Sequence, residues 1–469
     1  MVIGVIDFAN VEKYRENNRI EAKRALGGLP YSVWETYSSF ANTMGGVILL
    51  GVEEGKDKSF HAVDLPNPQK LIEKFWRQLN DKRRVSVNIL TKNNVRMERV
   101  GAKRIVVIEV PRAHRADKPV YIENDMMHGT YRRGGEGDYR CTPEEIAAMR
   151  RDAAERSQDM NLIEQLSMAD LCEQTLADYR AEMRALRPGH ALERCSNNEL
   201  LIQLNGAGTG QDGILHPSVA GLLMFGRHEA ILRALPDYRV AFAKAGTVGA
   251  GELPYNLYRF SRHVMGDLAL RFSRSETARG AIREALTNCL VNADYRSRGG
   301  IFVESTADTV RFSNPGGFRI DPGKARSGGV SDTRNKALSR MFQLIGMGAG
   351  VGGGIPRMLS AWRRGARPTP FFSESFDPER TTLTLPLKRI TPRDTGGKRR
   401  AMPAAYARQM LAEYLTSAIR ASASQISAAV GMSLPSVRRY LAIMRREGIV
   451  ICEGQGRSAV WRLRERAGL

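Results

Sequence analysis

Three polar side chains at regular spacing could carry out chemistry on a phosphorylated ligand. Glu284, Asn288 and Asn292 recur every four residues in the stretch AIREALTNCLVNADY, residues 281–295. In a helix they lie along one stripe, beside apolar positions that a core would cover. Glu284 could accept a proton from an attacking water, and the Asn288 amide oxygen could bind Mg2+. This stretch predicts a helix that presents a general base and a metal ligand.

Two glycine-rich stretches follow this helix and could surround a nucleotide. Asn314-Pro-Gly-Gly317 comes after the strand-like residues VRF, and its glycines permit close approach of the backbone to a ligand. Residues 346–354 hold six glycines and lead into IPRMLSAWRR. Backbone N–H groups at the start of that helix could cradle phosphates. The three stretches together predict a nucleotide cradle.

These motifs, in this order, resemble those of the GHKL ATPases, a fold shared by histidine kinases and type II topoisomerases. The similarity is greatest to the branch described as a RecG-like C-terminal ATPase domain, whose pattern reads REALxNAxxHRDY, NPGG, RN and GxGI. The resemblance implies a GHKL-type α/β sandwich within residues 206–395, with ATP and Mg2+ as cofactors. Three positions depart from the pattern: Asn292 replaces a His, Ala293 replaces an Arg, and Asn314 replaces the Asp with which most GHKL enzymes read adenine.

The resemblance also implies roles for individual residues. Glu284 would be the general base and Asn288 the Mg2+ ligand. The ATP contacts would come from Asn288, Asn292, Asn314, Gly316, Gly317, Arg334, Asn335, Gly350, Gly352, Gly353 and Gly354. The alternative is a mixed sheet whose glycines only make turns.

The balance of charge predicts a polyanionic partner. The chain has 469 residues, with 71 Lys and Arg against 50 Asp and Glu, a net charge of +21 and a pI near 10.0. A soluble protein this basic usually meets nucleic acid. The length predicts roughly three domains.

Nothing in the sequence indicates a secreted or membrane protein. The five cysteines are scattered and form no CxxC pair, as expected for free thiols in a reducing cytosol. The longest apolar run, VILLGV, is far too short to span a bilayer, and Asp7 interrupts the N-terminal apolar stretch. We therefore expect a cytoplasmic protein.

Four charged residues near the N-terminus could act on a phosphodiester. Glu16 and Glu21 precede a predicted helix, and Glu53 lies at the end of the strand-like run 47–52 that follows it. Strand ends often gather ligand-binding residues, so these carboxylates could converge on one divalent metal. Lys23 could neutralise a transition-state phosphate. The alternative is that Glu16 and Glu21 are solvated charges in an alternating run.

Residues 1–150 resemble the Schlafen-type AlbA-like domain. Its signature, E-x4-E-[FA]-K, FANxxGGxLxxGVxD and YxRxG, corresponds here to ENNRIEAK, FANTMGGVILLGVEE and TYRRGGEGDY. The resemblance implies an AlbA-like N-terminal domain that binds nucleic acid. By analogy with the animal Schlafen nucleases, it also implies RNA cleavage by Glu16, Glu21 and Glu53, the last standing in place of an Asp.

Arginines interleaved with tyrosines suit a nucleic-acid surface at the end of this region. Arg132 and Arg133 lie in YRRGGEGDYR, where rings could stack on bases and guanidinium groups could hold phosphates. The same residues could form a plain basic surface. Residues 151–205 follow and predict a helical linker.

The tail, residues 401–469, predicts a winged helix-turn-helix. QISAAVG and LPSVRRYLAIMRREG read as two helices joined by a short turn, and IVICEGQGRSAVWRL reads as a hairpin. Residues 397–469 contain 13 basic and 4 acidic side chains, a balance of +9 that suits DNA. The expected contacts are Ser436, Arg438, Arg439, Arg446 and Arg457, although winged helices also bind proteins.

The whole pattern predicts a multidomain α/β and α+β protein. The leading interpretation is an ATP-responsive regulator, plausibly of transcription, that binds DNA and self-associates as a homo-oligomer, with RNA as the other candidate ligand. The alternative is a metal-dependent nuclease of the Schlafen type, gated by ATP and active in antiphage defence. A histidine kinase is disfavoured, because no histidine occupies a phosphoacceptor helix upstream of the ATP motifs.

Overall fold

Two compact units make up the protein, residues 1–153 with 400–469 and residues 154–399. The computed structural model describes residues 19–56, 59–134, 137–244, 251–348, 352–365, 367–376, 378–387, 420–430, 432–454 and 459–464, with six residues between 407 and 415. Glu16, Gly350 and Arg457 lie outside the described residues. The mixed α/β, multidomain fold class expected from the sequence is confirmed.

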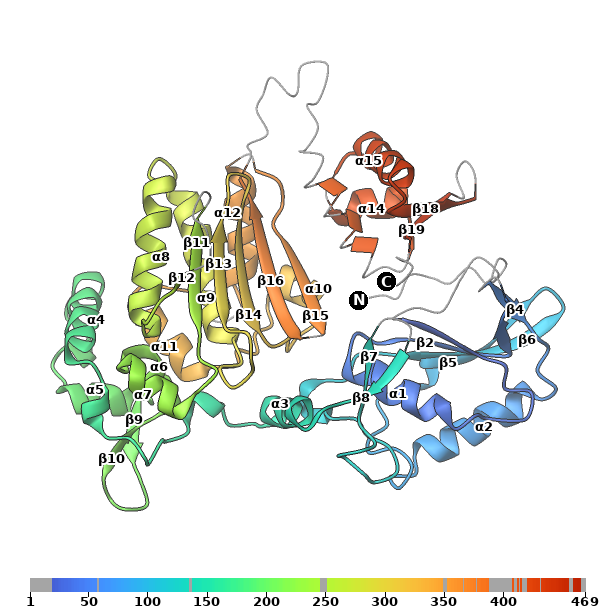
Figure 1. Ribbon diagram of the computed structural model, residues 1–469, viewed down its shortest axis with the longest axis horizontal. Coiled ribbons are helices and arrows are strands. Elements are labelled where there is room, and N and C mark those ends of the chain that lie inside the picture. Colours follow the sequence, from blue (N-terminus) through green and yellow to red (C-terminus); the bar gives the residue numbers. More distant parts are fainter. Residues whose placement is uncertain are drawn as a thin grey trace. The chain divides into compact units, whose positions relative to one another are not determined.

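A four-stranded sheet organises the N-terminal residues, in the order β1-β2-β6-β5 (Figure 1). β1 is parallel to β2, whereas β6 is antiparallel to both β2 and β5. Two separate pairs, β3 with β4 and β7 with β8, add to it. The strands are β1 (Ile20–Lys23), β2 (Gly46–Leu50), β3 (Val52–Glu54), β4 (Phe60–Ala62), β5 (Val95–Val100), β6 (Lys103–Val110), β7 (Tyr131–Gly134) and β8 (Gly137–Arg140).

Both faces of this sheet are buried, because the all-apolar β2 sends alternate side chains to opposite sides. Ile48 and Leu50 face the core beneath α1 and α2, where Trp34 stacks on Phe75 at a ring-centroid distance of 5.2 Å. The other β2 side chains face a smaller cluster around Phe60. The helices of this part are α1 (Ser32–Asn42), α2 (Pro68–Leu79) and α3 (Pro143–Ala153).

The second unit contains a six-stranded sheet in the order β12-β11-β13-β14-β16-β15 (Figure 1). Only β11 and β13 pair in parallel; the other neighbours are antiparallel. The strands are β11 (Val240–Lys244), β12 (Gly251–Glu252), β13 (Ile301–Ser305), β14 (Thr309–Pro315), β15 (Phe371–Phe376) and β16 (Glu379–Pro386). The helices between β12 and β15 are α8 (Leu257–Arg271), α9 (Glu276–Asn292), α10 (Pro322–Ser327), α11 (Lys336–Leu344) and α12 (Gly354–Arg364).

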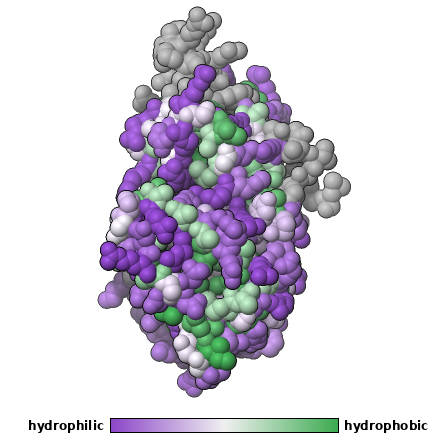
Figure 2. Space-filling model, turned by 90° about the vertical axis from the view of Figure 1, so that its left-hand side faces the viewer, coloured by the Kyte–Doolittle hydropathy of each residue, from purple (hydrophilic) through white to green (hydrophobic). Residues whose placement is uncertain are grey.

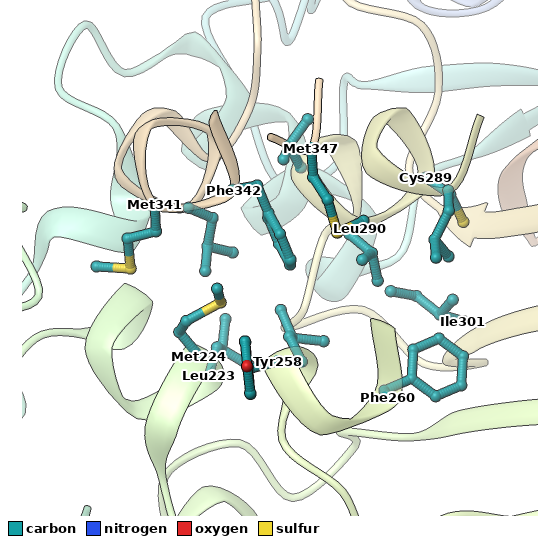
Figure 3. Close-up of a cluster of buried hydrophobic side chains, with 14 of the residues drawn as sticks. Leu223, Met224, Tyr258, Phe260, Cys289, Leu290, Ile301, Met341, Phe342 and Met347 are labelled. Atoms are coloured by element: carbon teal, nitrogen blue, oxygen red, sulfur yellow. The ribbon is translucent and has the colours of Figure 1, made fainter. Parts of the chain in front are cut away.

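Residues 157–204, for which the sequence predicted a linker, pack into the core of this second unit. Tyr179 and Met183 are buried in the same cluster as α9 and α11. Figure 3 shows Leu223 and Met224 meeting Phe342 there. The elements of this region are α4 (Glu173–Leu186), α5 (Asn197–Gln203), β9 (Ala207–Thr209), β10 (Leu215–Pro217), α6 (Val219–Phe225) and α7 (His228–Ala234).

The C-terminal residues form a helix, a turn, a second helix and a strand pair, in the order that the sequence predicted. The elements are β17 (Ala421–Ser422), α14 (Ala423–Val430), α15 (Leu434–Arg446), β18 (Val450–Glu453) and β19 (Val460–Leu463). The strands form a sheet in the order β17-β19-β18. The winged-helix assignment itself stays a prediction.

Hydrophilic residues surround smaller hydrophobic areas on the face shown in Figure 2. Exposed apolar side chains of the second unit include Leu186, Ile202 and Leu270. No helix among the described ranges combines the length and the apolar composition that a membrane crossing needs.

A close backbone contact makes Gly221 of α6 irreplaceable. A Cβ atom there would lie 1.9 Å from the carbonyl oxygen of Gly206. Gly221→Ala should therefore lower the free energy of unfolding of the second unit by about 3 kcal/mol, as overpacking does. Gly266→Ala in α8 is the matched control, because its Cβ would meet nothing within 4 Å; it should stabilise the helix by about 1 kcal/mol. Equal denaturant midpoints for the two variants would contradict this packing.

Candidate functional site

A cavity opens in the second unit where α9, β14, the segment 317–334 and the start of α12 meet. The empty space in and in front of it, open solvent included, is about 1070 Å³. Apolar side chains such as Phe312 and Leu383 form one part of its wall, and polar side chains such as Glu284 and Asn288 form another. Its mixed lining suits a ligand with an apolar ring and a charged tail.

The polar stripe of α9 is ordered by its own hydrogen bonds. Nδ2 of Asn288 donates to the Glu284 backbone oxygen at 2.9 Å and to Glu284 Oε1 at 3.1 Å. Nδ2 of Asn292 donates to the Asn288 backbone oxygen at 3.0 Å. Because Nδ2 of Asn288 makes both bonds, Oδ1 is the atom that this residue can offer to a cation.

The glycine-rich turn ends directly against Glu284. A Cβ atom on Gly354, the first residue of α12, would lie 1.8 Å from Glu284 Oε1. Only glycine therefore lets the N-terminus of α12 approach that carboxylate so closely. Gly352 adopts a positive φ of 70°, in the region that favours glycine. The turn thus brings backbone N–H groups of a helix N-terminus beside the proposed base.

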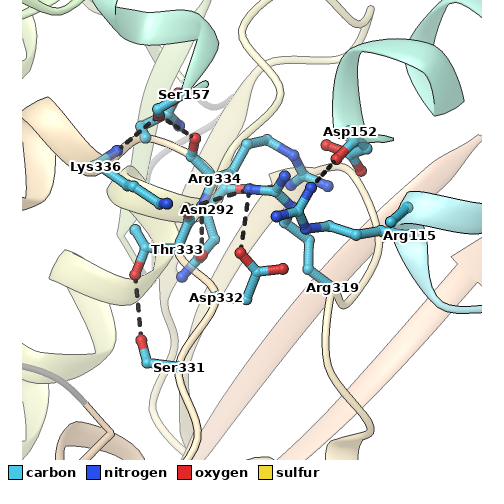
Figure 4. A network of polar contacts seen from close by, with 12 residues as sticks. Arg115, Asp152, Ser157, Asn292, Arg319, Ser331, Asp332, Thr333, Arg334 and Lys336 are labelled. Atoms are coloured by element: carbon cyan, nitrogen blue, oxygen red, sulfur yellow. Dashed lines mark hydrogen bonds and ion pairs between the residues drawn. The ribbon is translucent and has the colours of Figure 1, made fainter. Parts of the chain in front are cut away.

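Arg334 connects two walls of the cavity. Its guanidinium group donates to the backbone oxygen of Asn292 and, at 3.3 Å, to the backbone oxygen of Gly317. Its backbone N–H donates to Asn292 Oδ1 at 3.4 Å (Figure 4). Gly316 has a φ of 89°, and a Cβ atom there would lie 2.5 Å from the Arg334 guanidinium. The N-P-G-G turn thus needs a glycine to accommodate the arginine.

The floor of the cavity carries two polar groups from neighbouring strands. Asn314 of β14 is 5% exposed and pairs in register with Thr381 of β16. Nδ2 of Asn314 donates to the Pro315 backbone oxygen at 3.0 Å, and the Thr381 hydroxyl donates to the Gly316 backbone oxygen at 2.9 Å. These bonds leave Oδ1 of Asn314 as its hydrogen-bond acceptor for a ligand.

Not every residue predicted to contact ATP lines the cavity. Asn335 instead donates from Nδ2 to the backbone oxygens of Val291 and Ala293, at 3.1 and 2.8 Å. It thereby caps the C-terminal end of α9. Gly316 and Gly353 do not line it either. The predicted residues that do are Glu284, Asn288, Asn292, Asn314, Gly317, Arg334, Gly352 and Gly354.

Sequence reasoning missed several residues of the cavity. Arg319 and Asp332 form an ion pair across the segment that follows the N-P-G-G turn, with 3.8 Å between the charged atoms. Cys289 also lines the cavity, and burial raises the pKa of its thiol to about 12, so the group stays protonated. The sequence signal that could have predicted Arg319 and Asp332 is their position between the N-P-G-G and R-N motifs.

The N-terminal carboxylate Glu21 is engaged by two cations. Lys23 Nζ lies 2.6 Å from Glu21 Oε1, and the Arg133 guanidinium lies 2.8 Å from Glu21 Oε2. The Arg133 side chain is only 2% exposed and also pairs with Asp138 at 2.9 Å. This interior position differs from the surface position that the sequence suggested for Arg133. Both cations compete with any metal for the Glu21 carboxylate.

The other predicted residues of this region are partly exposed. Glu53 lies 3.3 Å from Nε of Arg24, and Arg132 lies 2.9 Å from Glu145. Within the described ranges, no group of three or more His, Cys, Asp or Glu residues is arranged to hold a metal ion.

The second C-terminal helix, α15, presents a row of basic side chains. Arg438, Arg439 and Arg446 are exposed, whereas Val437, Tyr440, Leu441 and Met444 are buried. The Arg439 guanidinium lies over the ring of Tyr440, 4.7 Å from its centroid. The Ser436 hydroxyl is 2.8 Å from that of Ser433. The exposed arginines could meet phosphates of a duplex.

Family comparisons agree with two of these parts. Residues 16–142 match the family described as "Schlafen, AlbA_2", and residues 299–385 match "Putative ATP-dependent DNA helicase recG C-terminal". We refer to residues 16–142 as the AlbA_2 domain and to residues 299–385 as the RecG C-terminal domain, after the families that they resemble. Residues 147–241, between them, match a domain of unknown function, DUF8451. The AlbA_2 domain and the RecG C-terminal domain are those expected from the sequence.

Two solved structures are similar at low TM-scores. The DIP2311 protein from Corynebacterium diphtheriae is 17% identical over 95% of each chain, with a TM-score of 0.39. The N-terminal domain of a putative ATP-dependent DNA helicase RecG-related protein from Nitrosomonas europaea is 33% identical over 29% of this chain and 92% of that one, with a TM-score of 0.23. No curated protein matches.

The two cations that pair with Glu21 predict that its carboxylate stabilises the AlbA_2 domain. Glu21→Gln leaves the buried Arg133 with one carboxylate fewer and should lower the free energy of unfolding of the AlbA_2 domain by about 3 kcal/mol. Glu98→Gln, in a half-exposed pair with Arg96, is the matched control and should cost under about 1 kcal/mol. Urea denaturation measures both. A Glu21→Gln protein as stable as wild type that had lost metal-dependent cleavage would contradict this role.

Proposed function

We propose that the protein is a nucleotide-responsive regulator that binds nucleic acid, with DNA as the first candidate. The AlbA_2 domain and the RecG C-terminal domain suggest a nucleic-acid-binding, ATP-dependent protein. In the proposal, ATP with Mg2+ binds in the cavity of the second unit and changes the affinity of the AlbA_2 domain and the C-terminal helices for nucleic acid. The protein works in the cytoplasm as a homo-oligomer, as related ATPase modules commonly do.

One observation carries the nucleotide part of the proposal. Glu284 of α9 meets the N-terminus of α12, Asn288 lines the cavity one turn along α9, and Asn314 and Thr381 lie on the strands of the cavity floor. This arrangement supports a phosphate end beside α12 and a base end above the strands. Oδ1 of Asn288 and phosphate oxygens would hold Mg2+, which would supply charge neutralisation at the phosphates.

The nuclease alternative has weaker support. Glu21 is already paired with Lys23 and Arg133. Glu53 has Arg24 beside it. A metal ion at these residues would lie close to the positive charges of Lys23, Arg133 and Arg24 and would be repelled by them.

Asn288 and Glu284 should separate binding from hydrolysis. Asn288→Ala removes the proposed metal ligand, so ATP affinity in Mg2+ should fall about ten-fold or more. Glu284→Ala should keep ATP binding and lower hydrolysis by roughly 10²-fold or more, because it removes the base. Titration without Mg2+ is the internal control, where Asn288→Ala and wild type should bind alike. Full affinity in both variants with Mg2+ present would refute the assignment.

The arginines of α15 should govern the salt dependence of DNA binding. Removing Arg439 and Arg446 together should reduce the slope of log affinity against log salt concentration by about 2, because each phosphate contact contributes roughly 0.9. Arg363→Ala with Arg364→Ala removes the same charge from the exposed end of α12 and is the matched control. The readout is duplex retention at several salt concentrations without nucleotide. An unchanged slope in the α15 variant would exclude this helix from the DNA interface.

A further inference from the structure

Helix α11 connects two of the proposed nucleotide motifs. It begins directly after Arg334-Asn335 and ends directly before the glycine-rich turn. Ser339 and Gln343, on its cavity side, line the cavity. A shift of this helix would therefore move both motifs and two lining residues together.

The N-terminus of α11 is capped by residues far away in the sequence. Its own N-cap residue, Asn335, makes no side-chain cap bond, because its amide ends α9 instead. The Leu338 backbone N–H donates to Asp159 Oδ2 at 3.0 Å, and the Lys336 backbone N–H donates to the Ser157 hydroxyl at 3.0 Å. These bonds satisfy N–H groups that a helix start leaves without an intrahelical partner.

Ser157 also contacts Arg334, the residue that connects two walls of the cavity. Its hydroxyl oxygen lies 2.8 Å from the backbone oxygen of Arg334 (Figure 4). The same oxygen lies 2.6 Å from Asp159 Oδ1. Ser157 and Asp159 are 6% and 1% exposed, so these contacts are shielded from water. The backbone of Arg334 is thus held by Ser157, while its guanidinium group holds Asn292 and Gly317.

The middle and the C-terminus of α11 are held from the same region. The Tyr179 hydroxyl donates to the Met341 backbone oxygen at 2.9 Å in the buried core. The Arg187 guanidinium donates to the backbone oxygens of Leu344 and Gln343 at 3.2 and 2.9 Å. Helix α11 has no acidic residue in its first turn and no basic residue in its last. Asp159 and Arg187 supply the charges that a helix dipole favours at its two ends.

We propose that Ser157, Asp159, Tyr179 and Arg187 form a clamp on α11 that sets the nucleotide affinity of the cavity. All four belong to the stretch that matches the domain of unknown function, outside the RecG C-terminal match. The inference assigns this stretch a positioning role and rests on the proposed nucleotide function. The four residues touch α11 and Arg334, so they act on a nucleotide only through those groups.

The test compares clamp variants with variants of the same residue types elsewhere in the same region. Arg187→Ala is matched by Arg180→Ala: Arg187 directly follows α4, Arg180 lies on α4, and Arg180 likewise donates to backbone oxygens, those of Glu193 and Cys195. Ser157→Ala is matched by Ser218→Ala, since Ser218 is also buried, accepts from a helix N–H and donates to a backbone oxygen. Each intact variant protein is titrated with ATP in Mg2+ well below its melting temperature.

The clamp predicts an effect on affinity that does not follow stability. Arg187→Ala and Ser157→Ala should weaken ATP binding roughly three- to ten-fold, the range expected when a remote residue is coupled to a site. Arg187→Lys should recover part of the affinity, because it keeps the charge at the helix C-terminus. Arg180→Ala and Ser218→Ala should leave affinity unchanged, whatever melting temperature they lose.

Two results would overturn the clamp and one would overturn the proposed function. Wild-type affinity in both clamp variants would show that α11 needs no external support. Equal losses in the control variants would show general destabilisation in place of positioning. Wild-type protein that binds no ATP would remove the nucleotide function itself, and the clamp with it.

Discussion

The buried guanidinium group of Arg334 is the contact on which the nucleotide cavity depends. A cation that is 7% exposed must find acceptors, because leaving it unpaired in the interior costs several kcal/mol. Its acceptors include the backbone oxygens of Asn292 and Gly317, so the end of α9 and the N-P-G-G turn are drawn to one point. Gly316 must then lack a side chain, since the guanidinium fills the space where a Cβ atom would lie. One arginine thus fixes the spacing of two motifs that lie far apart in the sequence.

The opposite end of the cavity is governed by charge and close approach. Glu284 lies against Gly354, at the N-terminus of α12, where the helix dipole favours an anion. A bound phosphate would be drawn to the same N–H groups. The carboxylate and the phosphates would therefore compete for this position unless a cation lies between them. Asn288, one turn along α9, could hold such a cation through Oδ1. The proposed need for Mg2+ thus follows from the local charges.

Much of the cavity could be predicted because its motifs are local. Glu284, Asn288 and Asn292 share one helix, and the high glycine content of the turns is visible directly in the sequence. The interior position of Arg133 could not be predicted, because its partners Glu21 and Asp138 come from other strands and a charge run looks alike on either side of a sheet.

The contacts of Ser157 and Asp159 with α11 could not be predicted from the sequence either. Ser157 and Asp159 lie about 180 residues before the helix that they cap. No periodic pattern relates positions at that separation, and the composition of residues 151–205 suggested a linker. Leu176, Tyr179 and Met183 of this stretch instead belong to the core of the second unit, in the same cluster as residues of α9 and α11. Long-range caps of this kind are determined by tertiary structure alone.

The measurement that tests the central claim most directly is a calorimetric titration of the intact wild-type protein with ATP, with and without Mg2+. The account predicts saturable binding of one nucleotide per chain that strengthens when Mg2+ is present, because Asn288 and the phosphates would share the cation. Absence of saturable heat at millimolar ATP with Mg2+, a concentration that detects even weak binding, would contradict the account. The cavity between α9 and α12 would then serve another ligand.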